Sequence, residues 1–460
     1  MSSLPDIPEA MQRQLKTLGA ELDRRRSLSA SLAGYDEGGS AIPAAVIRAR
    51  LTNAYRLLMG MANAPWGSLV VDSVLDRLEV SGIRTGDKAL DDAAWSMWQD
   101  NGFDSESKLA HRAALLDGRA FALIWPDGDS ESPVISVDDM TQMVVSYAEG
   151  SRRIRTAAMR RWVDDDDQTH ATLYRPDGIF KFQAGSTAAG GETKWEAREV
   201  AGETWPLENP YKVVPVVEYA VNRKLKPGQF PFARGEFEHC TGLLDRINLL
   251  TFLGLVVALW QGFPLRGVIG ESIKYDAVTD DDGNVAQVPQ APFDAQADHL
   301  FQLENPEAKL AEYKAADRAN LAVYPELDQL AVITKTPRHY FPLAQGMTNI
   351  SADAIRASEG GLHAKVASHK SSLGESHEEM LRVAGLMRKN EVVIPSSAET
   401  QWKDSESRSL AERADAASKL KDILPPAALM EMVLNATPSQ IARWEAQGGI
   451  ATLLAGVAKP

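Results

Sequence analysis

The chain has 460 residues, of which 44% are hydrophobic and 24% are charged, a composition that indicates about two to four folded domains and excludes disorder over the whole chain. Its formal net charge of −14 excludes a protein that holds nucleic acid tightly through phosphate contacts, because such binding needs an excess of Lys and Arg. The charge is typical of a large protein kept in solution, and it does not exclude a looser contact with DNA.

Three further features limit the class of protein. The single cysteine, Cys240, excludes an intrachain disulfide, fits a reducing cytoplasm and is expected to pack as a small hydrophobic residue. The polar stretch 1–11 contains Pro5 and Pro8, so we expect no signal peptide there. The most apolar stretch, 249–260, is shorter than the about 20 residues of a membrane span, and it predicts a helix that is buried or faces another subunit.

The first half of the chain is expected to mix helices with strands. Apolar residues at helical spacing predict helices at 8–32, from Pro43 onward, and at 65–78, 90–99 and 105–116, the last of them capped by Asp104 or Ser105. Strands are expected at 79–84 and 119–125. Alternating apolar runs separated by turn signals then predict an antiparallel meander with strands at 143–147, 155–162, 171–174 and 179–182.

The second half is expected to be mainly helical, with one small insertion that contains strands. A helix is predicted at 235–262, and a compact segment at 266–306 follows it, with strands at 265–269 and 299–303. A helix at 317–336 contains Pro325, so it either kinks there or begins near that residue. The pattern at 351–390 predicts the longest helix, roughly 60 Å at about 1.5 Å per residue, with a bend at Gly360-Gly361. Short helices are expected at 405–454.

The sequence has none of the motifs of common enzyme active sites. It lacks a Walker-type phosphate loop, a G-x-S-x-G nucleophile elbow and an H-E-x-x-H zinc motif. The spacing of His363, His369 and His377 does not place them on one helix face for metal binding, so solvated or interface histidines are expected. The sequence therefore predicts no catalytic residue, no metal site and no cofactor.

Two acidic runs and one basic run have simple structural interpretations. The Asp residues at 164–167 predict a solvated turn, and the run at 280–284 predicts a hairpin turn because it lacks the alternate spacing and distal Glu of a calcium loop. Arg153, Arg155 and Arg161 could share one face of a strand. For these arginines, an ordinary surface or a salt bridge between subunits is favoured over nucleic-acid contact, because aromatic residues are not interleaved with them.

The order of elements after residue 235 carries a resemblance to one family. Two helices flank a small insertion rich in strands, and a short loop then leads into a very long helix. Supporting local patterns are VDSVLDRL at 71–78, ALLDGRAF at 114–121, GEF through DRIN at 235–248 and AVITKTP at 331–337. In this arrangement the chain resembles the portal (head–tail connector) proteins of tailed bacteriophages, specifically of siphophages of Gram-positive hosts, over nearly its whole length.

The resemblance implies an α+β portal fold made of six parts in chain order. A mixed α/β wing would occupy 1–234, a first stem helix 235–265, a small α/β clip 266–316 and a second stem helix 317–337. The tunnel loop and the long wing helix would follow at 338–404, and a helical crown at 405–460. A ring with cyclic symmetry needs two different contact faces on each subunit, and a chain of this length has room for them.

The resemblance also implies which residues meet DNA, neighbouring subunits and partners. The channel would be narrowed by an uncharged tunnel loop that does not hold moving phosphates, with the residues Gln345, Gly346, Met347, Thr348 and Asn349. Neighbouring subunits would bury the apolar part of the first stem helix, with the residues Leu249, Leu253, Val256, Leu259 and Trp260. The candidate docking residues of the clip are Asp280, Asp281 and Asp282.

The function expected from the resemblance is a ring-shaped DNA channel at one capsid vertex, used in genome packaging and ejection, and not an enzyme. The expected partners are other copies of the chain in a ring of about twelve, the terminase large subunit, a head–tail adaptor, the major capsid and scaffolding proteins, and double-stranded DNA that passes non-specifically, with no membrane. The expected location is the portal vertex of the virion, and the host cytoplasm during assembly. The alternatives are another ring-forming capsid or head–tail joining protein and an α/β enzyme with an unrecognised site.

Overall fold

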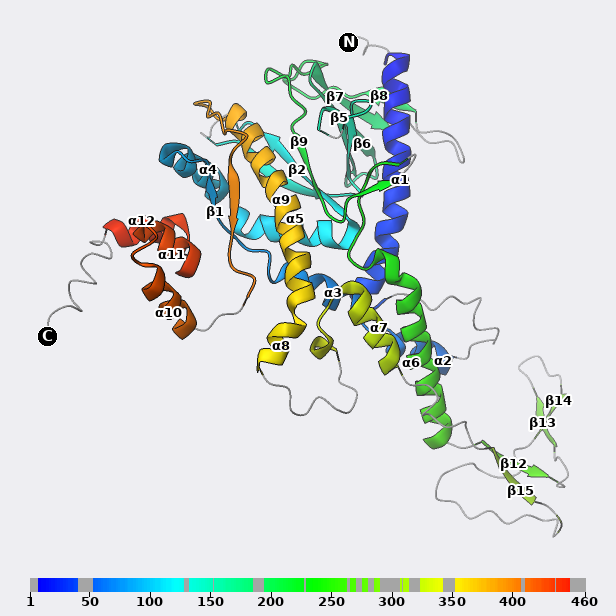
Figure 1. Ribbon diagram of the computed structural model, residues 1–460. Helices are drawn as coiled ribbons and strands as arrows, with labels where there is room; N and C mark the ends of the chain where they lie inside the picture. Colours follow the sequence, from blue (N-terminus) through cyan, green and yellow to red (C-terminus); the bar gives the residue numbers. More distant parts are fainter. Residues whose placement is uncertain are drawn as a thin grey trace. The chain divides into compact units, whose positions relative to one another are not determined.

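In a computed structural model of the chain, the described residues are 7–39, 53–127, 132–151, 153–184, 194–226, 229–262, 265–269, 275–279, 285–289, 307, 309–313, 323–341, 352–406, 410–434 and 436–446. The chain divides into two units, whose elements Figure 1 labels. The larger unit comprises Met1–Ala41, Ala64–Arg246 and Tyr324–Pro460. The smaller unit comprises Ile42–Asn63 and Ile247–Val323.

The larger unit contains both helices and antiparallel sheets. Its helices are α1 (Glu9–Glu37), α3 (Trp66–Leu75), α4 (Lys88–Asp100), α5 (Phe103–Asp117), the short η2 (Glu238–Cys240), α7 (Tyr324–Thr334), the short η4 (Arg338–Tyr340), α8 (Ala352–Ser358), α9 (Gly360–Met387), α10 (Leu410–Leu420), α11 (Pro426–Leu434) and α12 (Pro438–Ala446). Its strands are β1 (Val80–Arg84), β2 (Arg119–Trp125), β3 (Val134–Asp139), β4 (Met143–Tyr147), β5 (Arg155–Val163), β6 (Thr169–Arg175), β7 (Gly178–Ala184), β8 (Trp195–Ala197), β9 (Val216–Ala220), β10 (Lys224–Lys226), β11 (Gln229–Phe232) and β16 (Glu399–Trp402).

The predicted meander is confirmed as a five-stranded antiparallel sheet in the order β4-β5-β6-β7-β8. Helix α1 covers one face of this sheet, because its apolar residues recur at the spacing of one helix face. The shared core contains Met11, Leu15, Leu18 and Leu22 of α1 with Val144, Ala157, Met159, Ala171, Leu173, Phe180 and Phe182 of the sheet. Leu15 and Leu22 are fully buried, so this contact fixes the N-terminal helix on the sheet.

A second, three-stranded sheet has the order β3-β2-β9, and two helices of the larger unit pack against it. Helix α5 packs on β2 and β3, and α9 packs on β9 and β2 (Figure 1). Strand β16, which follows α9, pairs antiparallel with β1 and places Thr400 opposite Ile83. The long helix α9 is therefore held by strands from the first and the last third of the chain.

The smaller unit contains α2 (Asn53–Ala62), most of helix α6 (Thr241–Gly262) and two strand pairs. Strand β12 (Leu265–Ile269) pairs antiparallel with β15 (Lys309–Tyr313), and β13 (Tyr275–Thr279) pairs antiparallel with β14 (Val285–Pro289). The strand expected at 265–269 is confirmed. The strand expected at 299–303 and the turn expected at 281–284 lie outside the described residues.

Three expectations about helix ends and contents are settled by the structure. Helix α5 begins after Gly102, and the prediction of Asp104 or Ser105 as its cap is wrong, because the Asp104 carboxylate accepts a hydrogen bond of 2.9 Å from Trp98 Nε1 instead. The described helix α7 begins at Tyr324, so Pro325 lies in its first turn, where the missing N–H costs nothing. The expected bend at Gly360 is confirmed as the break between α8 and α9.

Two glycines of α9 are expected to respond in opposite ways to the change to Ala. A Cβ atom at Gly385 would lie 2.2 Å from the Val392 carbonyl oxygen, so Gly385→Ala forces the chain apart and is expected to lower the free energy of unfolding by about 1–3 kcal/mol. A Cβ at Gly360 meets no atom within 4 Å, so Gly360→Ala is expected to raise it by about 0.5 kcal/mol. Urea unfolding of both variants tests this, and equal effects would contradict the close approach at Val392.

Candidate functional site

Helix α6 is long and apolar. It carries no Asp, Glu, Lys or Arg from Ile247 to Gly262. By length and composition alone the segment Glu238–Leu259 could cross a membrane, yet only 28% of its most apolar stretch is buried inside the chain. A soluble helix that is apolar on all sides has to be covered by protein, and the chain itself covers only part of this one.

Helix α2 supplies the part of the cover that the chain provides. Ala62 of α2 and Phe252 of α6 are buried against each other, and partly buried apolar residues surround them: Leu58 and Met59 of α2 with Leu249, Leu255 and Val256 of α6. This contact was not anticipated from the sequence, where 42–63 was assigned to the wing with the rest of the N-terminal part. The apolar run Leu57-Leu58-Met59 is the signal that could have indicated it.

The five predicted stem residues of α6 divide into two groups. Leu249 and Val256 are partly buried because they contact α2 of the same chain. Leu253 and Leu259 each remain 37% exposed, and the side chain of Trp260 lies outside the described residues. Leu253 and Leu259 are therefore the residues of this set with surface left for a neighbouring subunit.

Helix α7, expected as the second stem helix, has one buried and one exposed face. Leu327, Leu330 and Ala331 are buried in the larger unit. Arg246 fixes the helix to the start of α6, because its guanidinium forms an ion pair with Glu326 and donates a hydrogen bond of 2.9 Å to Gln329 Oε1. Its other face is open to solvent.

The apolar residues of that open face are Val332, which is 78% exposed, and Ile333, and the exposed Gln329 lies beside them one turn earlier in the helix. An exposed apolar patch next to paired charges is typical of a protein contact surface.

The remaining predicted site residues cannot be placed on the fold. Gln345, Gly346, Met347, Thr348 and Asn349 of the tunnel loop lie outside the described residues, and so do Asp280, Asp281 and Asp282 of the clip. The described strands β13 and β14 lie on either side of the acidic run, which agrees with an antiparallel pairing around it.

A buried carboxylate joins α9 to the segment before α6. Glu236 is 4% exposed, and its oxygens lie 2.8 Å from Lys365 Nζ, 2.8 Å from His369 Nε2 and 2.7 Å from Asn222 Nδ2. Burial opposes its charge, but the hydrogen bond from His369 and the charge of Lys365 outweigh it and lower the pKa of Glu236 to about 2. The expectation of a solvated or interface histidine is wrong for His369, which is buried by this carboxylate.

His377 of α9 is also fully buried, in a cluster that joins three elements. Its Nε2 lies 2.8 Å from His111 Nε2 of α5, and its Nδ1 lies 2.9 Å from the Tyr219 hydroxyl of β9. The rings of Trp98, Phe103 and Trp402 pack around it. Of two facing ring nitrogens one must donate and the other accept, so this hydrogen bond is lost when both rings are protonated.

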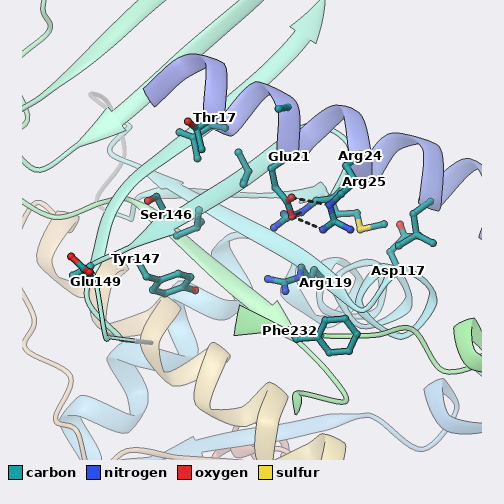
Figure 2. A pocket seen from close by; sticks show the side chains of 18 of the residues that line it. Thr17, Glu21, Arg24, Arg25, Asp117, Arg119, Ser146, Tyr147, Glu149 and Phe232 are labelled. Carbon is teal, nitrogen blue, oxygen red and sulfur yellow. Dashed lines mark hydrogen bonds and ion pairs between the residues drawn. The ribbon is translucent and has the colours of Figure 1, made fainter. Parts of the chain in front are cut away.

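A cavity of about 650 Å³ lies between α1, β4 and the start of β2 (Figure 2). Glu21 accepts hydrogen bonds of 2.9 and 2.8 Å from Arg24 and one of 2.8 Å from Arg25, and Arg119 forms an ion pair with Glu218. Burial opposes the charge of Glu21, but the two arginines outweigh it and lower its pKa to about 2. The pairs of Glu21 lie within α1, and the Arg119–Glu218 pair joins β2 to β9. These pairs do not form the nucleophile–base arrangement of a catalytic site.

The charged runs singled out in the sequence have partners within the chain. Arg155 forms an ion pair with Glu379 of α9, and Arg161 forms one with Asp23 of α1. Asp164, in the predicted turn between β5 and β6, accepts hydrogen bonds from the backbone and lies 2.6 Å from His170 Nε2. Among the described residues, no group of three or more His, Cys, Asp or Glu could hold a metal ion.

The family model that matches the chain is that of the phage portal protein, SPP1 Gp6-like, and the match covers residues 63–449. The chain belongs to this family. The portal protein of Mycobacterium phage L5 is 29% identical to it over 375 residues, which are 78% of this chain and 72% of the relative. The portal protein of Mycobacterium phage D29 is 30% identical over 379 residues, which are 78% of this chain and 73% of the relative.

Solved structures of gene transfer agent particles contain chains that are similar in a more distant way. A chain of the native virion is 11% identical, covers 84% of this chain and 94% of its own length, and has a TM-score of 0.44. A chain of the neck of the native particle, computed with C12 symmetry, is 11% identical, covers 83% of this chain and 92% of its own length, and has the same TM-score of 0.44.

Membership of the portal family confirms the resemblance seen in the sequence and the mixed α and β fold. The chain is a structural protein of a phage virion that forms the DNA channel at a capsid vertex, as a ring of subunits. The family match favours a portal protein over another capsid or head–tail joining protein. The match begins at residue 63, so α1 and α2 both precede it.

Acid is expected to destabilise the larger unit through the buried histidine pair. Burial lowers the pKa of His111 to about 3 and also lowers that of His377, whereas the unfolded chain takes up protons near 6.5. The stability that these groups contribute is therefore complete above pH 6.5 and is lost as the pH falls towards 3. Between pH 6.5 and 5, His111 alone is expected to lower the free energy of unfolding by about 2 kcal/mol, at about 1.36 kcal/mol per pH unit.

The control for this prediction is His111→Gln, which keeps a hydrogen-bonding group but cannot be protonated. Denaturant unfolding is measured at pH 6.5 and pH 5. The free energy of unfolding should fall between these pH values by about 2 kcal/mol less in this variant than in the unchanged chain. The same loss in both proteins would show that the pair does not control the acid sensitivity.

Proposed function

We propose that about twelve copies of the chain form a closed ring that passes double-stranded DNA without reading its sequence, during both genome packaging and ejection. The observation that carries this proposal is helix α6, an uncharged apolar helix of which only 28% of the most apolar stretch is buried within one chain. Neighbouring subunits in a ring provide the missing cover, and a membrane is not needed for it.

The parts of the proposed ring follow the order of elements along the chain. Helices α6 and α7 serve as the stem, and the segment 266–316 between them serves as the clip that docks the terminase large subunit and later a head–tail adaptor. Residues 345–349 serve as the uncharged tunnel loop, α9 as the long wing helix behind it, and 405–460 as the crown. The major capsid and scaffolding proteins surround the ring, which assembles in the host cytoplasm before it becomes part of the virion.

The proposed role is structural and not enzymatic. The sequence has no Walker-type phosphate loop, so a partner such as the terminase supplies nucleotide hydrolysis. The net charge of −14 supports a conduit, because a wall with few unpaired basic groups does not hold the phosphates of moving DNA.

Replacing Leu259 by Asp is expected to abolish ring formation and leave the single chain folded. Leu259 is 37% exposed in the single chain, so a carboxylate there remains hydrated until a second subunit covers it. Negative-stain images of the purified protein should show rings for the unchanged chain and none for Leu259→Asp, while circular dichroism of the two remains alike.

The matched control is Leu259→Met, which keeps the apolar volume and should keep the rings. Val256 is a poorer position, because it packs on α2 and its replacement would also disturb the chain's own contact. Normal rings from Leu259→Asp would contradict the burial of α6 between subunits, and an unchanged chain that remains monomeric under all assembly conditions would contradict the ring itself.

A further inference from the structure

Helix α2 has two apolar faces, and the chain buries only one of them. The inner face, with Leu58, Met59 and Ala62, packs on α6. The outer face carries Leu57 and Met61, which are 68% and 63% exposed. These two residues are four positions apart, so they lie next to each other along one side of the helix.

Such a helix is not stable by itself. It has ten residues, fewer than the about 12–15 that an isolated helix needs in water. Its only charged residue is Arg56, so the helix has few groups that would keep its apolar outer face soluble in water. A short helix with apolar residues on opposite sides is typical of one that lies between two protein surfaces.

The matching surface occurs on the same chain. The open face of α7 presents Val332, which is 78% exposed, together with Ile333 and the uncharged Gln329. The charged residues of α7 are paired towards other parts of the chain, Glu326 with Arg246 and Asp328 with Arg338. The open face thus offers apolar surface without an unpaired charge that burial would penalise.

We propose that the outer face of α2 packs against the open face of α7 of the neighbouring subunit, so that α2 lies between the chain's own α6 and its neighbour. A cyclic ring is built from heterologous contacts, in which each subunit uses two different surfaces. The two apolar patches suit such a pair, because every copy carries both and their side chains are exposed among the described residues. The proposal rests on the ring described above and names a contact within it, formed by a helix that precedes the family match.

Cross-linking between introduced cysteines tests this contact. In the variant Met61→Cys with Val332→Cys, a short bismaleimide added to assembled rings should join neighbouring chains and give a ladder of covalent oligomers in denaturing gels. The native Cys240 is buried, and burial raises the pKa of its thiol to about 11, so it does not compete for the reagent. The single variants Met61→Cys and Val332→Cys should form rings but run only as monomers in denaturing gels. A heterologous contact does not bring a residue next to its own copy, so these variants have no pair of thiols to cross-link.

A second pair, Leu57→Cys with Ile333→Cys, serves if the first variant does not fold. Rings that are visible by negative stain but give no ladder with either pair would overturn the α2–α7 contact and leave the ring intact. Dimers from Met61→Cys alone would also overturn it, since they indicate a symmetric contact, as would a cross-link from Met61→Cys to a different protein in whole particles.

An independent measurement uses the assembly equilibrium. Met61→Asp is expected to raise the protein concentration needed for ring formation at least tenfold, whereas Met61→Leu leaves it unchanged. An unchanged assembly concentration for Met61→Asp would contradict the proposal, and the failure of the unchanged chain to form rings would contradict the proposed function instead.

Discussion

The uncharged surface of α6 is the constraint on which the rest of the subunit depends. From Ile247 to Gly262 the helix has no charged group, and burial of apolar surface contributes roughly 25 cal/mol for each Å². The chain covers one side with α2 and leaves Leu253 and Leu259 for other protein. A fold that keeps such a helix in solution has to be completed by association, and this makes oligomer formation part of the folding of the stem.

The larger unit differs from α6, because its buried polar groups find partners within the unit. Glu236 is held by Lys365 and His369, and His377 is held by His111 and Tyr219. Buried polar groups of this kind have few alternative partners, so they fix the position of α9 against its neighbouring elements. The unit is therefore suited to act as a rigid body.

Local patterns predicted most of the helices and strands, because each depends on residues near one another in the chain. The face of α1 and the five-stranded meander follow from spacing alone. The packing of Leu58 on α6 and the burial of His377 join segments far apart in sequence, and no local pattern distinguishes a buried histidine from a solvated one. Asp104 shows a further limit of local patterns, because its carboxylate accepts a hydrogen bond from Trp98 and does not cap the helix.

The position of α2 also bears on the curvature of the assembly. Packed helices lie about 8–10 Å apart, and the distance and crossing angle depend on the side chains between them. A helix inserted between adjacent subunits acts as a wedge, and the angle of the wedge repeats at every contact around the circle. The sizes of Leu57 and Met61 thus help to set how many subunits close the circle, and a wedge of the wrong angle leads to an open helical filament instead.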